Sequence, residues 1–137
     1  MPDNPNKATS VLLPEASIEI FALSSETKEI ADVLKNDWRF GRTTIQSHDG
    51  STAEAIKIYS EQSSPDLVII ETKTIDQGFI EQLQKLGETC TEGTNAIIIG
   101  PDNDIQLYRE LKEMGVSDYY VHPVSHDNIK NDIASVL

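Results

Sequence analysis

Basic residues are scarce in this sequence. Eleven Lys and Arg residues stand against 23 Asp and Glu, which gives a formal net charge of -12. Binding to nucleic acids depends mainly on neutralising phosphates, so a surface with this charge disfavours a nucleic-acid partner. The same repulsion disfavours an anionic membrane face. The charge balance therefore disfavours both kinds of anionic partner.

Cysteine and long apolar runs are also nearly absent. Cys90 is the single cysteine and cannot form an internal disulfide, and its spacing predicts a packing residue in a reducing compartment. No apolar run approaches the roughly 20 residues that span a membrane, and no signal peptide opens the sequence. We therefore expect a cytoplasmic protein without direct membrane insertion, and 137 residues suit one domain.

The sequence divides into a short leader and one regular domain. Residues 1–16 hold three prolines among polar residues, which predicts a flexible leader in which Val11-Leu12-Leu13 touches the domain surface. Residues 17–137 alternate between strand and helix patterns five times. Leu67-Val68-Ile69-Ile70 is unbroken by polar residues and predicts a central strand covered on both faces. The other predicted strands are Ile18–Leu23, Thr43–Gln46 at the sheet edge, Ala96–Ile99 and Asp118–Val121.

Capping residues mark the expected helix starts between these strands. They are Ser25, the boxes Ser51–Glu54 and Thr74–Gln77, Asp102 or Asn103, and Ser125. The third helix carries an apolar stripe, and the fourth is expected to bury Ile105, Tyr108, Leu111 and Met114. Trp38 is expected to close the rim of the core. Right-handed crossovers then predict an α/β fold of three layers, a flavodoxin-like doubly wound five-stranded parallel sheet in the order 2-1-3-4-5.

Residues 17–137 resemble the receiver domain of two-component response regulators, the CheY-like fold. That family places an acidic metal-binding pair after strand one, a phosphoacceptor Asp after strand three, a Thr or Ser after strand four, and a Lys before Pro after strand five. An aromatic residue often precedes the Lys by three positions, and Tyr119 matches it. At the five functional positions this sequence has Ser24, Ser25, Glu71, Gly100 and His122, so every one departs from the pattern.

These departures predict a vacated phosphorylation site. Hard cations prefer carboxylates to serine hydroxyls, and imidazole is mostly neutral near pH 7. We therefore expect no catalysis, metal or cofactor. Glu71 is expected to lie in a partly wet crevice with its charge solvated. The alternative, that Glu71 imitates a phosphorylated Asp, would be supported by a pair with His122. A working phosphoreceiver would need Glu71 or a nearby residue such as Asp76 as the acceptor.

Residues 86–123 carry a more specific resemblance. The segments Glu88–Thr94, Ile98–Gly100, Asn103–Ile105, Leu107–Leu111 and Gly115–Tyr119 are similar to the N-terminal atypical receiver of CpaE/TadZ-type Tad (Flp) pilus-assembly proteins. In that family the domain precedes a MinD/ParA-like ATPase and helps to place the assembly machinery at the cell pole. The resemblance implies a non-catalytic interaction domain with pilus-assembly partners, polar or recruited to the inner membrane face through them. The alternatives are a working phosphoreceiver and a small-ligand or metal sensor.

The fourth helix offers a candidate interaction surface. Helix geometry places Leu107 about 200° from Ile105, so one large apolar side chain must face outward. In receivers generally, the face of helix four, strand five and helix five is the dimer or output face. By this resemblance the candidate interaction residues are Leu107, Tyr108, Arg109 and Tyr119, serving a protein partner or a homodimer.

Overall fold

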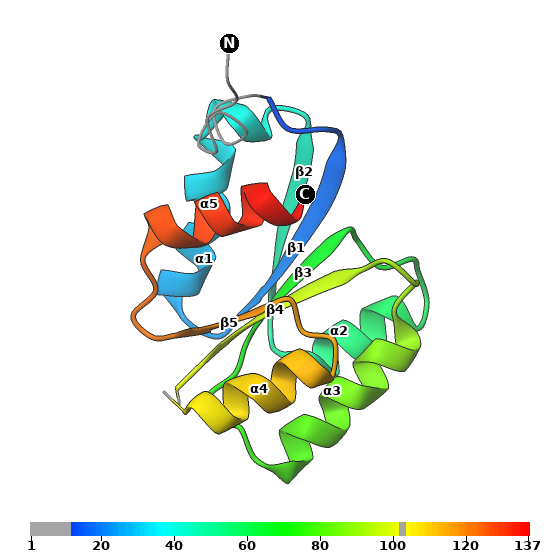
Figure 1. Cartoon of the computed structure of the whole chain (residues 1–137). Coiled ribbons are helices and arrows are strands. Elements are labelled where there is room, and N and C mark those ends of the chain that lie inside the picture. Colours follow the sequence, from blue (N-terminus) through cyan, green and yellow to red (C-terminus); the bar gives the residue numbers. More distant parts are fainter. Residues whose placement is uncertain (1–11, 102–103) are drawn as a thin grey trace, which may run out of the picture.

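The computed structural model describes residues 12–101 and 104–137. Its sheet has five parallel strands in the order β2-β1-β3-β4-β5, which confirms the predicted doubly wound fold (Figure 1). The strands are β1 (Ala16–Ala22), β2 (Thr43–Asp49), β3 (Leu67–Glu71), β4 (Asn95–Gly100) and β5 (Asp118–Val121). The helices are α1 (Ser25–Lys35), the 3-10 turn η2 (Trp38–Phe40), α2 (Thr52–Tyr59), α3 (Gln77–Thr89), α4 (Ile105–Glu113) and α5 (His126–Val136).

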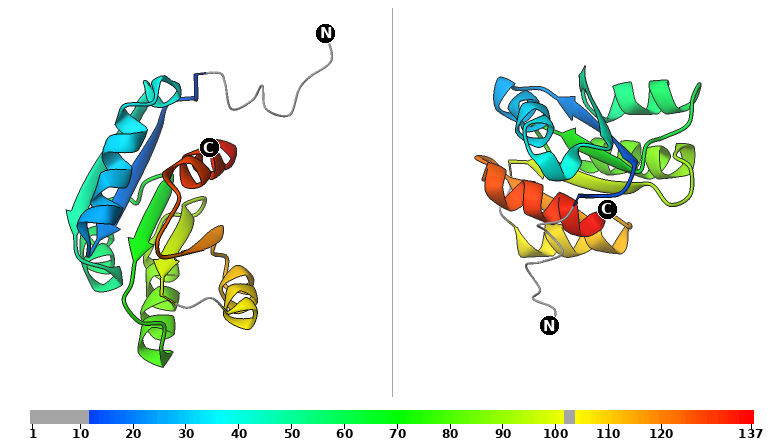
Figure 2. Two further views of the ribbon diagram at one scale, coloured as in Figure 1. Left: turned by 90° about the vertical axis from the view of Figure 1, so that its left-hand side faces the viewer. Right: turned by 90° about the horizontal axis from the view of Figure 1, so that it is seen from above.

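Helices cover both faces of the sheet, as Figure 2 shows in two views. A separate hydrophobic core lies on each face, between the sheet and its helices. Successive strand residues point to opposite faces, so Ile69 packs toward α1 and α5 while Ile70 packs toward α2, α3 and α4. All five residues of β3 are buried. The unbroken apolar run is thus explained by helices covering both faces, as predicted.

The start of the domain differs from the prediction. Strand β1 begins at Ala16, and Leu13 is a core residue with 5% exposure rather than a surface contact. The Leu13 amide donates a hydrogen bond to the carbonyl of Arg39 at 2.8 Å, which ties this segment to η2. Residues 1–11 of the predicted leader lie outside the described residues.

The turn η2 overturns the expectation for Trp38, which is 60% exposed and does not close the core. Asp37 caps the turn, which directs Arg39 and Phe40 inward instead. The Arg39 guanidinium lies 2.7 Å from the Asp37 carboxylate and 3.2 Å from the Asn131 amide oxygen on α5. The hydrogen bonds from Arg39 hold the pKa of Asp37 below its ordinary value, against the raising effect of burial. This buried ion pair links η2 to α5.

Two helices begin at caps other than those predicted. Ser24, not Ser25, caps α1, and its hydroxyl accepts a hydrogen bond from the Thr27 amide at 3.3 Å. Asp76, rather than Thr74, caps α3 by accepting a hydrogen bond from the Phe79 amide at 2.8 Å. In both cases a suitable cap stood one or two positions away from the predicted residue, so composition alone could not choose.

Helix α4 is rotated relative to the prediction. Its cap is Asp104, whereas the predicted caps at 102–103 lie outside the described residues. Leu111 is fully buried, with Leu107 and Met114 packed beside it. Ile105 lies about 120° around the helix from Leu111 and is 72% exposed, so the prediction that it joins the core is wrong.

Candidate functional site

Glu71 ends the central strand at the carboxyl edge of the sheet. This edge is where ligands and chemistry sit in doubly wound folds. The residue is only 4% exposed, although its side chain is a carboxylate. A buried charge of this kind must be satisfied by hydrogen bonds or by an opposite charge.

The chain itself supplies four partners to the Glu71 carboxylate. Oε1 accepts hydrogen bonds from the Leu23 amide at 2.6 Å and the Ser24 amide at 2.8 Å. Oε2 accepts one from the Ser24 hydroxyl at 2.8 Å, and Nε2 of His122 lies 2.9 Å from the same oxygen. A carboxylate offers about four lone-pair positions, so these four partners occupy its accepting capacity.

These partners also set the ionisation of Glu71. Burial alone would raise its pKa, but the hydrogen bonds from Leu23 and Ser24 act in the opposite direction and outweigh it. The pKa of Glu71 therefore lies below its ordinary value, and the side chain is a carboxylate at neutral pH.

The structure corrects the expectation of a solvated Glu71. Its carboxylate is enclosed rather than wet, because the loop after β1 folds over it and donates backbone amides. The contact with His122, which the phosphate-imitation alternative requires, is present. Neither the Leu23 amide nor the Ser24 amide carries a sequence signal, so sequence reasoning missed both.

The serines at the vacated acidic positions have different surroundings. Ser24 both caps α1 and donates to Glu71, whereas Ser25 is an exposed first residue of α1. Ser51 stands before α2 as predicted, but its hydroxyl makes no cap bond. It donates instead to the backbone carbonyl of Glu71 at 2.7 Å. The end of β3 is thus held through both its side chain and its backbone.

Gly100 ends β4 at the position where a receiver has a hydroxyl side chain. A Cβ added there would lie 2.7 Å from the Tyr119 hydroxyl oxygen and 3.0 Å from the Ile75 Cδ1 atom. The buried Tyr119 ring therefore occupies the space that a Thr or Ser side chain would need. The absence of a hydroxyl residue at this position is a packing requirement of this chain.

A separate hollow of about 460 Å³ lies beside the crevice. Its lining residues include Leu23, Ser51, Thr72 and Lys73, but neither Glu71 nor His122. Among residues 12–101 and 104–137, no group of three His, Cys, Asp or Glu side chains is placed to hold a metal ion. None of the helices in these ranges is long and apolar enough to cross a membrane.

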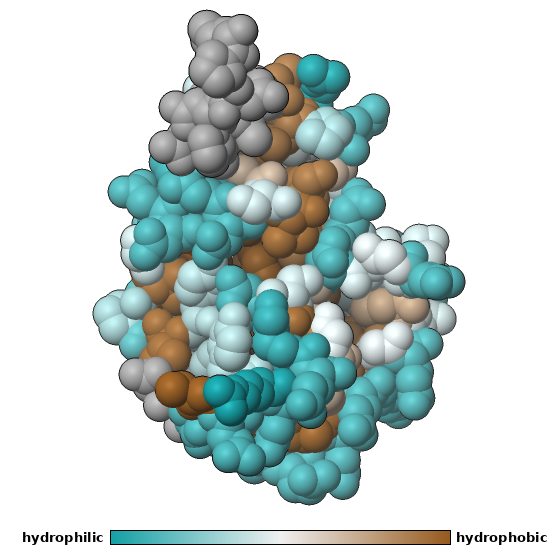
Figure 3. All heavy atoms as spheres, viewed as in Figure 1, coloured by the Kyte–Doolittle hydropathy of each residue, from teal (hydrophilic) through white to brown (hydrophobic). Residues whose placement is uncertain are grey.

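The second candidate site is the α4–β5 face, formed by Ile105, Tyr108, Arg109 and Val121. Ile105 and Tyr108, with 72% and 37% exposure, border a hollow of about 220 Å³ together with Val121. Figure 3 shows hydrophobic surface at the N-terminal end of α4, beside largely hydrophilic surface. Arg109 is exposed as expected, but Leu107 is half-buried and Tyr119 is buried. The exposed apolar residue of this face is thus Ile105. Tyr119 lines the same hollow, whereas Leu107 packs against the core.

Comparison with solved structures identifies the family. The pilus assembly protein CpaE of Caulobacter crescentus is 30% identical, with a TM-score of 0.85 over 93% of this chain and 97% of that chain. This chain belongs to the CpaE family of pilus assembly proteins. A candidate CpaE2 pilus assembly protein of Sinorhizobium meliloti is 31% identical, with a TM-score of 0.83 over 88% of this chain and 99% of that chain.

More distant structures establish the receiver fold of this CpaE-family chain. A CheY-like response regulator receiver domain protein of Methanospirillum hungatei has a TM-score of 0.68 at 15% identity, over 90% of this chain and 92% of that chain. At that identity the likeness concerns the fold alone. A scan against protein-family models and a search of curated proteins gave no match. The predicted resemblance to a CpaE-type receiver-like domain is confirmed.

Proposed function

We propose that this chain is a non-catalytic interaction domain that recruits or localises pilus-assembly machinery. The proposal rests on its membership of the CpaE family, whose solved relatives are pilus assembly proteins, together with the state of its crevice. The single observation that carries the non-catalytic part is the saturation of the Glu71 carboxylate by donors from its own chain.

Phosphoryl transfer to a receiver requires a carboxylate that is free to attack and a cation that neutralises the phosphoryl oxygens. In this crevice both carboxylate oxygens already accept two contacts each, and the expected metal ligands are replaced by Ser24 and Ser25. Displacing the donors would break the part-buried hydrogen bonds from the Leu23 and Ser24 amides to Glu71, which costs free energy. Phosphorylation is therefore opposed by the stability of the native network.

The same network joins three elements that meet at the carboxyl edge. Glu71 connects β3 to the start of α1 through Ser24 and to the segment after β5 through His122. Glu26 adds a second link, since its carboxylate accepts a hydrogen bond from the Val124 amide at 3.3 Å. The negative charge at the acceptor position thus links these elements without a phosphoryl group.

Partner binding is assigned to the α4–β5 face in this proposal. A solvent-exposed isoleucine beside a tyrosine and an arginine has the composition of an interface anchor. Either a pilus-assembly component or a second copy of the chain would cover Ile105 and Tyr108. The net charge of -12 favours a partner with a basic surface over self-association.

Intact-mass measurement after incubation with acetyl phosphate and Mg²⁺ tests the non-catalytic part. A response regulator with a complete acidic site serves as the positive control. We expect the control to gain the mass of a phosphoryl group and this protein to remain unchanged. A stoichiometric gain of that mass would refute the proposal. A thermal-shift screen with divalent metals and nucleotides addresses the sensor alternative, for which a rise in melting temperature would be required.

The partner part is tested on the α4–β5 face with Ile105→Ser and the matched control Gln106→Ser, an exposed neighbour on the same helix. We expect only Ile105→Ser to abolish co-purification with pilus-assembly components and polar placement of a fluorescent fusion. Sedimentation velocity of the same variants separates self-association from binding to another protein. Equal behaviour of the two variants in all three assays would remove this face from the proposal.

A further inference from the structure

A second hollow lies at the amino ends of β3 and β4, at the opposite end of the sheet from Glu71. We call it the basal hollow, and its volume is about 230 Å³. The apolar part of its wall comes from Val68, Leu83, Leu86, Cys90, Ala96, Met114 and Val116. The remaining lining residues are Gly87, Thr91, Glu92, Gly93, Thr94 and Gly115.

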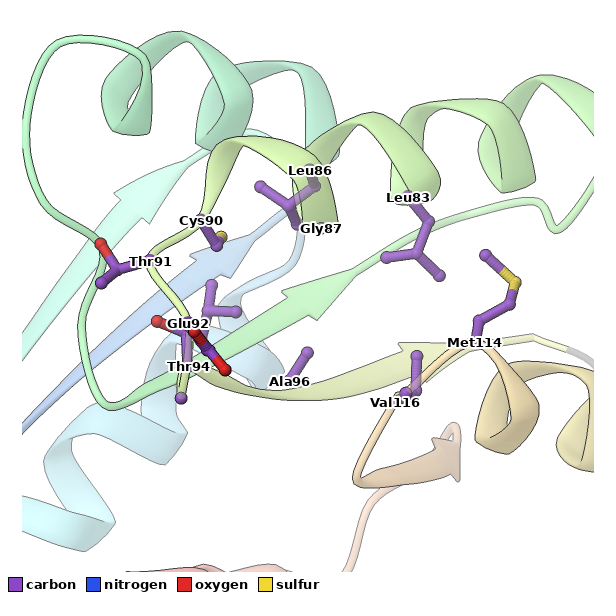
Figure 4. A pocket seen from close by; sticks show the side chains of 13 residues that line it. Leu83, Leu86, Gly87, Cys90, Thr91, Glu92, Thr94, Ala96, Met114 and Val116 are labelled. Carbon is purple, nitrogen blue, oxygen red and sulfur yellow. The ribbon is translucent and has the colours of Figure 1, made fainter.

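Much of the wall comes from two parts of residues 86–123, the segment whose sequence resembles the CpaE-type receiver most specifically. Residues 90–94 follow α3, and residues 114–116 join α4 to β5. Figure 4 shows Leu83, Leu86 and Cys90 on the α3 side, with Met114 and Val116 on the α4–β5 side and Ala96 between them. The proposed function, which concerns the crevice and the α4–β5 face, leaves this end of the molecule without a role.

Hydrogen bonds hold the rim of the basal hollow in place. The Thr91 amide donates to the Ser64 hydroxyl at 2.7 Å, and the Thr94 hydroxyl donates to the Pro65 carbonyl at 2.8 Å. On the other side, the Ser117 amide donates to the Ala96 carbonyl at 2.7 Å. The hollow is therefore preformed by fixed loops, as small binding sites commonly are.

Gly87 is a lining residue of the basal hollow with open space beside it. A Cβ added at this position would meet no atom within 4 Å. Gly93 and Gly115 have φ angles of +96° and +98°, so their backbones require glycine. Gly87 lies inside α3 with an ordinary helical backbone, where alanine would be more favourable. The chain thus carries a less stabilising residue at a lining position where no neighbouring atom excludes a side chain.

We propose that the basal hollow receives one apolar side chain, aromatic or leucine-like, from a partner segment with neighbouring basic residues. The apolar walls and the volume fit such a side chain, since a closed cavity of about 150 Å³ can hold a benzene ring. The charge of the partner follows from Glu92 on the rim and from the excess of 23 acidic over 11 basic residues.

Three capped tetrapeptides test this proposal: Lys-Lys-Phe-Lys, its Phe-to-Ala version and the charge-reversed Glu-Glu-Phe-Glu. Binding is followed by the amide NMR signals of Gly87, Gly93 and Gly115. We expect saturable shifts with the first peptide, and binding weaker by about tenfold or more without the aromatic ring. The charge-reversed peptide should bind several-fold more weakly, and Glu92→Gln should reduce that difference.

Filling the hollow provides the matched test on the protein side. Gly87→Leu should weaken binding of the first peptide by about tenfold or more, and Gly87→Ala should weaken it less, while neither lowers the melting temperature. Gln84→Leu, on the same helix but outside the lining, is the control and should bind normally. Absence of shifts with every peptide, or equal binding by Gly87→Leu and Gln84→Leu, would overturn the proposal.

Discussion

Replacing Glu71 tests whether the crevice stabilises the fold. Glu71→Leu removes the acceptor of the Leu23 and Ser24 amides, at 2.6 and 2.8 Å, and of the Ser24 hydroxyl. A fully buried amide left without a partner costs about 1–3 kcal/mol, and the part-buried amides of Leu23 and Ser24 should lie toward the lower end of that range. The leucine regains part of this by apolar burial, so we expect a loss of about 2–4 kcal/mol in the free energy of unfolding.

Glu71→Gln separates the charge from the hydrogen bonds. The amide oxygen keeps the contacts with the Leu23 and Ser24 amides, so the loss at pH 7 should be smaller, about 1–2 kcal/mol. The folded pKa of Glu71 lies below its ordinary value of 4.5, so the unfolded state binds the proton first as pH falls. The higher free energy of unfolding of wild type relative to Glu71→Gln is therefore fully present above pH 4.5. It disappears as the pH falls through the folded pKa of Glu71.

Urea unfolding followed by far-ultraviolet circular dichroism, repeated between pH 7 and pH 3, measures both effects. Glu29→Gln, at an exposed position of α1, is the matched control and should change stability little at any pH. The reasoning would be refuted if Glu71→Leu were as stable as this control. It would also be refuted if the difference between wild type and Glu71→Gln grew on acidification.

Four further substitutions test the packing and the buried ion pair. Gly100→Thr should cost about 1–3 kcal/mol because its Cβ meets the Tyr119 ring, and unchanged thermal unfolding would contradict that contact. Asp37→Ala should cost about 3–5 kcal/mol in urea unfolding at pH 7, since it removes the carboxylate that pairs with the buried Arg39 guanidinium. This loss should shrink in acid because the pKa of Asp37 is lowered in the folded state. Leu111→Ala should lower the free energy of unfolding by about 2–5 kcal/mol, and Ile105→Ala by less than about 0.5 kcal/mol. The reverse order in urea unfolding would show that Ile105, not Leu111, faces the core.

The sheet could be predicted from the sequence because its central strands are defined by composition alone. Leu67–Ile70 and Ala96–Ile99 contain only apolar residues, and such runs occur where helices cover both faces. The polar Thr43–Gln46 placed β2 at the edge for the same reason. These patterns involve many residues at once, so a single deviation does not change the conclusion.

The sequence did not show which face of α4 packs against the sheet. Its nine residues allow two apolar faces, one through Ile105 and Tyr108 and one through Leu107 and Leu111. The second face continues to Met114 at spacings of four and three, and that continuation was the available signal. Short helices with apolar residues on two sides are decided by packing against the sheet, which a sequence does not contain.

The sequence predicted which residues meet at the crevice, but not that the Glu71 carboxylate is enclosed there. Ends of parallel strands meet at one edge, so Glu71 and His122 could be placed at the same edge, and their pair was named as the contact that the phosphate-imitation alternative needs. The enclosure of Glu71 depends on backbone amides after β1 and on hydroxyls of Ser24 and Ser51. Ser51 was predicted as a helix cap and Ser24 stands next to the predicted cap Ser25, and a sequence does not show which partner a hydroxyl selects.

The central claim is that the Glu71 carboxylate is saturated by its own chain and has no place for a metal-bound phosphoryl group. An NMR titration with Mg²⁺ and beryllofluoride, a mimic of the aspartyl phosphate, tests it through the amide signals of Leu23, Ser24 and Glu71. We predict no saturable change in these signals at concentrations that saturate a receiver with a complete acidic site. Saturable shifts that Glu71→Gln abolishes would contradict the claim.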